Sequence, residues 1–247
     1  MRRLLGYLGA TAVLLASWWM LSVTVGSPAL PGPAPAIRDF VRLWGSDLLP
    51  QSLESTWRVI ASMTIGAGLG APLGLVIGRS PRLDAVAAPL VFLTYPIPKI
   101  VFLPVLLVLL GIGNAPKIAL ITIIVFFQIL VTARDAARGI SVAAVLSVRS
   151  LGATRAQVFR HVVVPAALPD VFTALRIGTG TAIAVLFFSE SVAGTSGLGY
   201  YILDAWGRIA YSEMFAGIIA MALLGVVLYE LLEMAEARVC RWTRVGR

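Results

Sequence analysis

The sequence contains 247 residues, of which 59% are hydrophobic and only 13% charged, and its mean hydropathy is +0.91. This composition excludes an ordinary soluble domain and predicts an integral membrane protein. The net charge of +8 does not indicate nucleic-acid binding, because the arginines lie at the ends of apolar segments and are not interleaved with aromatic residues. The single cysteine, Cys240, excludes an intrachain disulfide, and nothing in the sequence supports a metal or redox site.

The first apolar segment runs from Leu4 to Val25, directly after Arg2 and Arg3. A basic start before an apolar stretch also occurs in secretory signal peptides, but this stretch is longer than their usual core, so a first membrane span is favoured. Residues 26–35 contain four prolines and predict a surface linker. Residues 37–49 have the apolar spacing of an amphipathic helix and are expected at the membrane surface.

Later apolar segments are long enough to cross a hydrocarbon layer of roughly 30 Å. Together with the first span they predict an all-α integral membrane fold, with about six transmembrane helices in one bundle. We expect residues 1–50 to form the N-terminal helix and its external linker, and residues 51–247 the transmembrane core. The later segments cover about Ser52–Gly78, Ala85–Leu110, Lys117–Ala137, Val171–Ala193 and Glu213–Ala235.

A glycine recurs at every fourth residue along the second predicted span, at Gly66, Gly70, Gly74 and Gly78. This spacing places the four glycines on one helix face, where another helix can approach almost backbone to backbone. Tight static packing is the favoured interpretation, and a surface along which helices slide is the alternative.

The distribution of lysine and arginine between the spans predicts both termini in the cytoplasm. It makes residues 138–169 the longest cytoplasmic loop and leaves Arg38, Arg42, Arg58, Lys117 and Arg208 at the outer side. The residues then expected inside are Arg2, Arg3, Arg79, Arg82, Arg134, Arg138, Arg149, Arg155, Arg160, Arg238, Arg241, Arg244 and Arg247.

The cytoplasmic loop has explicit local signals for two short helices. Residues 142–149 can form the first, and Gly152 permits the positive φ that turns the chain. Thr154 and Gln157 have the spacing of a capping box, which starts a second helix through about Val163. We expect a helix–turn–helix elbow with apolar side chains available to a partner protein, namely Leu151, Val158, Phe159 and Val162, flanked by Arg155 and Arg160.

Pro165 and Pro169 follow the second loop helix and are expected to end it before the next span.

The spacing from Gly152 through nine residues to Val162 and Pro165 resembles the "EAA" loop of bacterial binding-protein-dependent importer permeases. One departure is Leu146, which stands where that motif usually has glutamate. Other segments resemble the nitrate/sulfonate/taurine branch of this family: Tyr95–Ile100, Leu109–Gly113, Ala166–Pro169, Ser189–Ser191 and Ser196–Tyr200.

The resemblance implies a permease subunit of an ATP-driven ABC importer in the bacterial plasma membrane, moving a small solute such as a sulfonate, taurine or nitrate. It also implies ATPase subunits, an external solute-binding protein and a second copy of this chain as partners. The chain has no P-loop motif, so no bound cofactor is expected, and ATP with Mg²⁺ would bind the partner ATPase. The only histidine, His161, has no acid or nucleophile at a useful spacing, so no catalytic role is expected. The alternatives are an ion-gradient-driven secondary transporter, an ABC permease for a vitamin precursor, and a membrane scaffold or assembly factor with no pathway.

Placing a charged side chain at the centre of a membrane span costs roughly 2.5–3.5 kcal/mol of insertion free energy. Charged residues inside a span are therefore candidates for function. Lys99 lies beside Pro96 and Pro98, where a broken helix could line a translocation pathway for an anion, or it could reach the membrane surface. Glu190 could contact the pathway or be a hydrogen-bonded helix-end acid. Arg176 is expected to reach the cytoplasmic headgroups, and the alternative is a functional pairing. The residues expected to couple the loop to the ATPase are Leu151, Gly152, Ala153, Thr154, Arg155, Gln157, Val158, Phe159, Arg160 and Pro165.

Overall fold

The structure, a computed structural model, describes residues 2–244, and this part is built of helices with no strand. Its contacts divide the chain into two compact units: Met1–Ser55 with Glu190–Leu224, and Thr56–Ser189 with Gly225–Arg247. Within residues 2–244, five helices are long and apolar enough to cross a membrane, or up to six if one bent pair counts as a single span. This confirms the predicted all-α integral membrane fold. Arg247, one of the predicted cytoplasmic charges, lies outside the described residues.

The first unit begins with α1 (Arg2–Val25) and α2 (Pro33–Leu43). Pro33 occupies the first turn of α2, where the missing N–H has no intrahelical partner to lose. The indole of Trp18 donates a hydrogen bond to the carbonyl of Pro31 at 2.9 Å and stacks on Phe215, with ring centroids 5.3 Å apart. The linker is therefore held against α1.

The predicted amphipathic segment is helical, but it is not separate from the next span. It continues from α2 through η1 (Trp44–Leu48) directly into α3 (Leu49–Arg79). The first unit also contains α10 (Leu198–Gly207), a helix that the sequence interpretation missed, between α9 (Val164–Ala193) and α11 (Tyr211–Val239).

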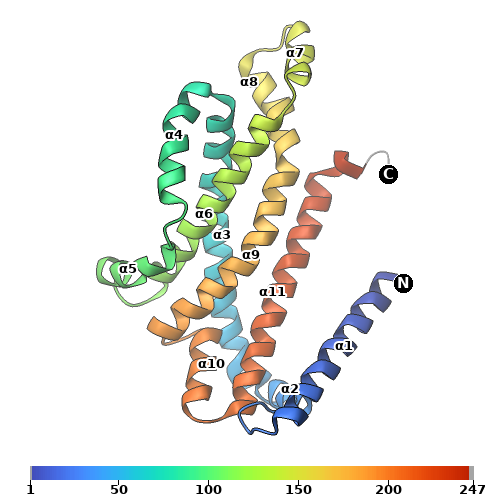
Figure 1. The fold of residues 1–247 in the computed structure, drawn as a ribbon, viewed down its shortest axis with the longest axis vertical. Coiled ribbons are helices and arrows are strands. Elements are labelled where there is room, and N and C mark those ends of the chain that lie inside the picture. Colours follow the sequence, from blue (N-terminus) through green and yellow to red (C-terminus); the bar gives the residue numbers. More distant parts are fainter. Residues whose placement is uncertain (1, 245–247) are drawn as a thin grey trace. The chain divides into compact units, whose positions relative to one another are not determined.

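The second unit corrects the predicted single span over residues 85–110. Here α4 (Pro81–Thr94) ends, and η2 (Lys99–Phe102) with α5 (Leu103–Leu110) leaves at a bend of 79°, so that α5 turns away from α4 (Figure 1). The break has a local cause, because Pro96 and Pro98 lack an N–H donor and disfavour helical geometry in the residues before them.

Between α6 (Asn114–Gly139) and α9 lie α7 (Val142–Ser150), α8 (Arg155–Val158) and η3 (Phe159–Val163). Figure 1 shows α7 and α8 forming a turn beyond the end of α6. The expectation that Pro165 and Pro169 end the loop helix is wrong, because the helix runs from Arg155 to Ala193. The wider π turn of η3, in which the N–H of Val164 donates to the carbonyl of Phe159, carries the helix into Pro165.

Candidate functional site

The loop between α6 and α9 is an elbow whose turns are fixed by local hydrogen bonds. The Ser141 hydroxyl accepts from the N–H of Ala144 at 3.2 Å and caps α7. Gly152 has a φ of +86°, and its N–H donates to the carbonyl of Arg149 at 3.0 Å. The predicted positive φ is confirmed, and a side chain at this position would strain the backbone.

The predicted capping box at the start of α8 is also confirmed. The Thr154 hydroxyl accepts from the N–H of Gln157 at 3.3 Å, and the Gln157 side-chain carbonyl accepts from the N–H of Thr154 at 2.8 Å. These reciprocal bonds satisfy two backbone donors that the helix start would otherwise leave open. The elbow is therefore preformed before any partner binds it.

The side chains of the elbow differ in how far a partner could reach them. Leu151 is 87% exposed at the turn, and Gly152, Thr154, Arg155, Gln157 and Arg160 are exposed as well. Ala153, Phe159, Val162 and Pro165 are half-buried. Val158 is only 6% exposed, so the expectation that it is available to a partner is wrong, because its side chain packs inward. Leu146, at the position of the missing glutamate, is 56% exposed on α7.

The glycine stripe of α3 faces α6 within the second unit. A Cβ added at Gly70 would lie 2.8 Å from the Phe126 carbonyl oxygen. Added at Gly74 or Gly78, it would overlap the carbonyl oxygens of Leu130 and Arg134 respectively. The two helices thus approach at backbone distance, which only glycine permits.

Lys99 lies at the break between α4 and η2, in the second unit. Its ammonium donates to the carbonyl oxygens of Thr94 at 3.0 Å and of Tyr95 at 2.5 Å, where α4 ends. The same Nζ lies 5.1 Å from the ring centroid of Tyr95 and 4.8 Å from that of Phe127. The structure therefore surrounds this cation with helix-end carbonyls and aromatic faces, both of which stabilise it. Pro96 and Pro98 form the exposed turn beside it.

Glu190 is fully buried and belongs to the first unit. Its carboxyl oxygens accept from the Ser55 hydroxyl at 2.9 Å and from the N–H of Gly199 at 2.8 Å. Ser55 in turn accepts from the N–H of Leu198 at 2.8 Å, and Gln51 accepts from the N–H of Gly197. The network joins the end of α9 and the start of α3 to the start of α10, which is the arrangement of a hydrogen-bonded helix-end acid.

Arg176 forms an ion pair with Glu236 of α11 at 3.0 Å, within the second unit. The Arg176 guanidinium is therefore paired within the helix bundle, between α9 and α11, instead of reaching only to the headgroups.

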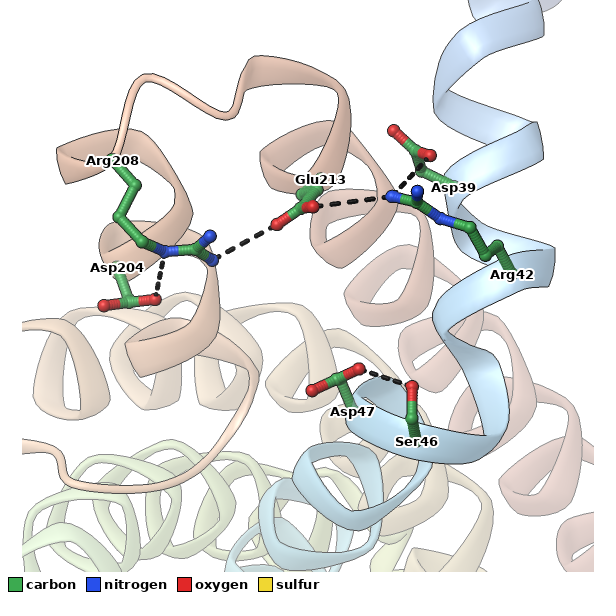
Figure 2. Close-up of polar contacts among 7 residues, drawn as sticks. All are labelled: Asp39, Arg42, Ser46, Asp47, Asp204, Arg208 and Glu213. Carbon is green, nitrogen blue, oxygen red and sulfur yellow. Dashed lines mark hydrogen bonds and ion pairs between the residues drawn. The ribbon is translucent and has the colours of Figure 1, made fainter.

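A chain of alternating charges in the first unit was not expected from the sequence (Figure 2). Glu213 at the start of α11 pairs with Arg42 of α2 at 3.5 Å and with Arg208 at 3.2 Å. Arg42 also pairs with Asp39 at 3.0 Å, and Arg208 with Asp204 at 2.8 Å. The hydrogen bond with Asp204 raises the pKa of the Arg208 guanidinium above its usual value. The spacing of Asp204 and Arg208 was visible in the sequence, but the contact of Arg42 with Glu213 was not.

The described residues contain no cluster of histidine, cysteine, aspartate or glutamate side chains able to hold a metal ion. Together, the apolar helices and the exposed elbow between two of them define a multi-pass membrane protein with a preformed loop on one side.

Comparisons with known proteins agree with this class. Residues 70–241 match the family described as "Binding-protein-dependent transport system inner membrane component". The taurine transport system permease protein TauC of Escherichia coli (strain K12) is 30% identical over 243 residues, covering 95% of this chain and 88% of TauC. The putative aliphatic sulfonates transport permease protein SsuC of Bacillus subtilis (strain 168) is 28% identical over 234 residues, covering 94% of this chain and 85% of SsuC.

A relative with a different solute in its name is similarly close. The riboflavin transport system permease protein RibX of Chloroflexus aurantiacus is 30% identical over 239 residues, covering 95% of this chain and 89% of RibX. Among solved structures, an inward-facing conformation of the MetNI methionine ABC transporter matches with a TM-score of 0.61 and 26% identity, covering 78% of this chain and 94% of that chain.

The chain therefore belongs to the family of binding-protein-dependent transport system inner membrane components, the membrane permease subunits of ABC importers. This membership decides against the ion-gradient-driven secondary transporter that the sequence had left as an alternative.

Proposed function

We propose that this permease imports a small anion, such as taurine, another sulfonate or nitrate, and that separate ATPase subunits drive it through the α7–η3 elbow. The observation that carries the proposal is the preformed elbow itself. Its turn is held by Gly152 and its second helix by the capping box of Thr154 and Gln157. Because the backbone is already ordered, a partner can bind it without an entropic cost of folding and can transmit a displacement to α9.

Energy coupling is supported by the continuity of the helix that leaves the elbow. Residues 155–193 form one helix, so a force applied near Arg155 acts on the whole length of α9. The chain has no nucleotide-binding motif, and we assign ATP and Mg²⁺ to the partner ATPase. We also propose that the elbow and both termini lie in the cytoplasm, which the positive-inside distribution of charge supports.

An anionic solute is favoured by the relatives and by Lys99. TauC and SsuC are named for taurine and sulfonate transport. The Lys99 ammonium has three N–H donors, and two of them bind the carbonyl oxygens of Thr94 and Tyr95. The third donor could therefore contact an anion. A vitamin-type solute is the second candidate, because RibX, a riboflavin permease by its name, is as identical to this chain as TauC.

We further propose that two copies of this chain enclose the pathway and that an external binding protein delivers the solute. On this proposal Lys99, Pro96 and Pro98 face the pathway, and Glu190 acts on it by holding the start of α10 in place.

The test of coupling is purification of the tagged chain from native membranes in mild detergent, with mass spectrometry of the proteins that accompany it. A P-loop ATPase should accompany the wild type and should be lost in Gly152→Val, because a β-branched residue resists a φ of +86°. Gly139→Val is the matched control, since no atom lies within 4 Å of an added Cβ at Gly139. Normal ATPase recovery with Gly152→Val would refute docking on the elbow.

The test of the solute is uptake of labelled taurine, nitrate and riboflavin by cells that contain the complete importer. Lys99→Met should reduce uptake of the anion strongly, whereas Lys99→Arg should retain part of it. If Lys99→Met transports the anion at the wild-type rate, Lys99 serves only to cap α4. Uptake of riboflavin alone would favour the vitamin-type solute.

A further inference from the structure

A basic hollow of about 620 Å³ lies in the second unit, between the α3–α4 turn and the elbow. We call it the arginine hollow. Its floor is apolar and includes Val158 and Val163, which are 6% and 1% exposed. Its rim carries Arg79, Arg82, Arg149 and Arg155.

No carboxylate lines the arginine hollow. Within the part of the chain that the structure describes, Arg82, Arg149 and Arg155 form no ion pair, and Arg79 donates only to the carbonyl of Ala137, at 3.4 Å. By contrast, Arg138 in the same unit pairs with Asp84 at 3.3 Å. Four cations around one hollow repel one another, so an anion bound between them would be stabilised by all four.

The position of the arginine hollow along the helices matches the depth of lipid headgroups. Arg79 is the last residue of α3, and Arg82 is the second residue of α4. The apolar surface of α4 begins directly after it, with Leu83 48%, Val86 66% and Leu90 59% exposed. Arginines that flank an apolar helix surface lie at the boundary between hydrocarbon and water.

We propose that the arginine hollow binds the phosphate headgroup of an anionic phospholipid, whose acyl chains lie along the exposed face of α4. A guanidinium group suits this ligand because its planar donors match phosphate oxygens in pairs. Acidic side chains of the ATPase could also pair with these arginines. A lipid is favoured because Arg82 of the hollow directly precedes the exposed apolar residues Leu83, Val86 and Leu90 of α4, a surface that acyl chains would cover and a water-soluble subunit would not.

The experiment uses the full chain with the subunits that copurify, partly delipidated in mild detergent. Native mass spectrometry then counts the bound phosphatidylglycerol or phosphatidylethanolamine, with identical acyl chains. The wild type should retain more phosphatidylglycerol than phosphatidylethanolamine, and added salt should reduce this difference. Equal retention of both lipids by the wild type would overturn the proposal without the need for any variant.

The double variant Arg82→Gln/Arg149→Gln should bind phosphatidylglycerol about 30-fold more weakly, because each arginine contributes about 1 kcal/mol to binding. Arg238→Gln/Arg241→Gln removes the same charge from exposed positions outside the hollow and should bind as the wild type does. Size-exclusion chromatography confirms that each variant is folded, and Arg82→Lys/Arg149→Lys, which keeps the charge, should bind at an intermediate level.

Two results would assign the arginine hollow to another ligand and refute the proposal. The first is a double variant that retains the lipid but loses the ATPase, because the arginines would then belong to the docking surface. The second is inorganic phosphate that binds the hollow as tightly as the lipid does, which would make it a site for the free ion. The first result would support ATPase docking on the elbow, which the Gly152→Val experiment tests independently, and neither result bears on the solute.

Discussion

The α3–α6 contact and the α7–η3 elbow both depend on glycine, but for different physical reasons. In the contact, Gly74 is required because a Cβ would overlap the Leu130 carbonyl oxygen. In the elbow, no atom lies within 4 Å of an added Cβ at Gly152, yet its φ of +86° disfavours any side chain. Substitution should therefore destabilise the first region and only reshape the second. Gly74 holds the fold, whereas Gly152 shapes the elbow that we propose binds the ATPase.

The largest effect is expected for Gly74→Ala in the α3–α6 contact. The added Cβ would also lie 2.8 Å from the Cβ of Ala133, so the two helices must separate. We expect the free energy of unfolding to fall by about 2–3 kcal/mol, which is typical of overpacking. The melting temperature of the detergent-solubilised chain should fall clearly.

Gly68→Ala is the control for this prediction, because it is in the same helix and no atom lies within 4 Å of its added Cβ. It should be neutral or stabilising, by up to about 1 kcal/mol from helix propensity. Equal melting temperatures for the two variants would show that the glycine spacing does not matter for packing.

A smaller loss is expected for Asp84→Asn, which tests the ion pairs beside the same contact. Asp84 of α4 pairs with Arg134 of α6 and, at 3.3 Å, with Arg138. The variant should lower the melting temperature less than Gly74→Ala does, because no backbone has to move. Asp135→Asn removes a pair with Arg134 at 3.4 Å whose carboxylate is 62% exposed, and should have almost no effect. A larger effect from Asp135 would contradict the assignment.

The smallest change in global stability is expected for Thr154→Ala, in the elbow. Loss of the cap should cost about 1 kcal/mol, confined to the start of α8, so hydrogen exchange there should accelerate while the melting temperature stays close to that of the wild type. If the ATPase docks on the elbow as proposed, its recovery should fall, because the start of α8 is less ordered. Gln157→Glu, which keeps the acceptor for the Thr154 N–H, should retain more ATPase. A large fall in melting temperature would show that the elbow also holds the fold.

Much of the fold was accessible from the sequence where the cause is local. The capping box involves residues three positions apart, and the turn at Gly152 depends on one residue. Local reasoning failed at Pro165, because the π turn of η3 lets the helix continue, and a proline alone does not reveal such a turn. The sequence interpretation also predicted one span over α4 and α5, although Pro96 and Pro98 indicate a break between them.

The sequence by itself determined the membrane class, the glycine face of α3 and the elbow, because apolar length, helical periodicity and turn chemistry act within a few residues. Only the tertiary structure decided which distant polar groups meet. Ser55 contacts Glu190 across 135 positions, and Arg42 contacts Glu213 across 171. Periodicity places such a side chain on a helix face, but the partner on that face depends on how the helices pack. The arginine hollow arises in the same way, from charges on separate segments that only the fold brings together.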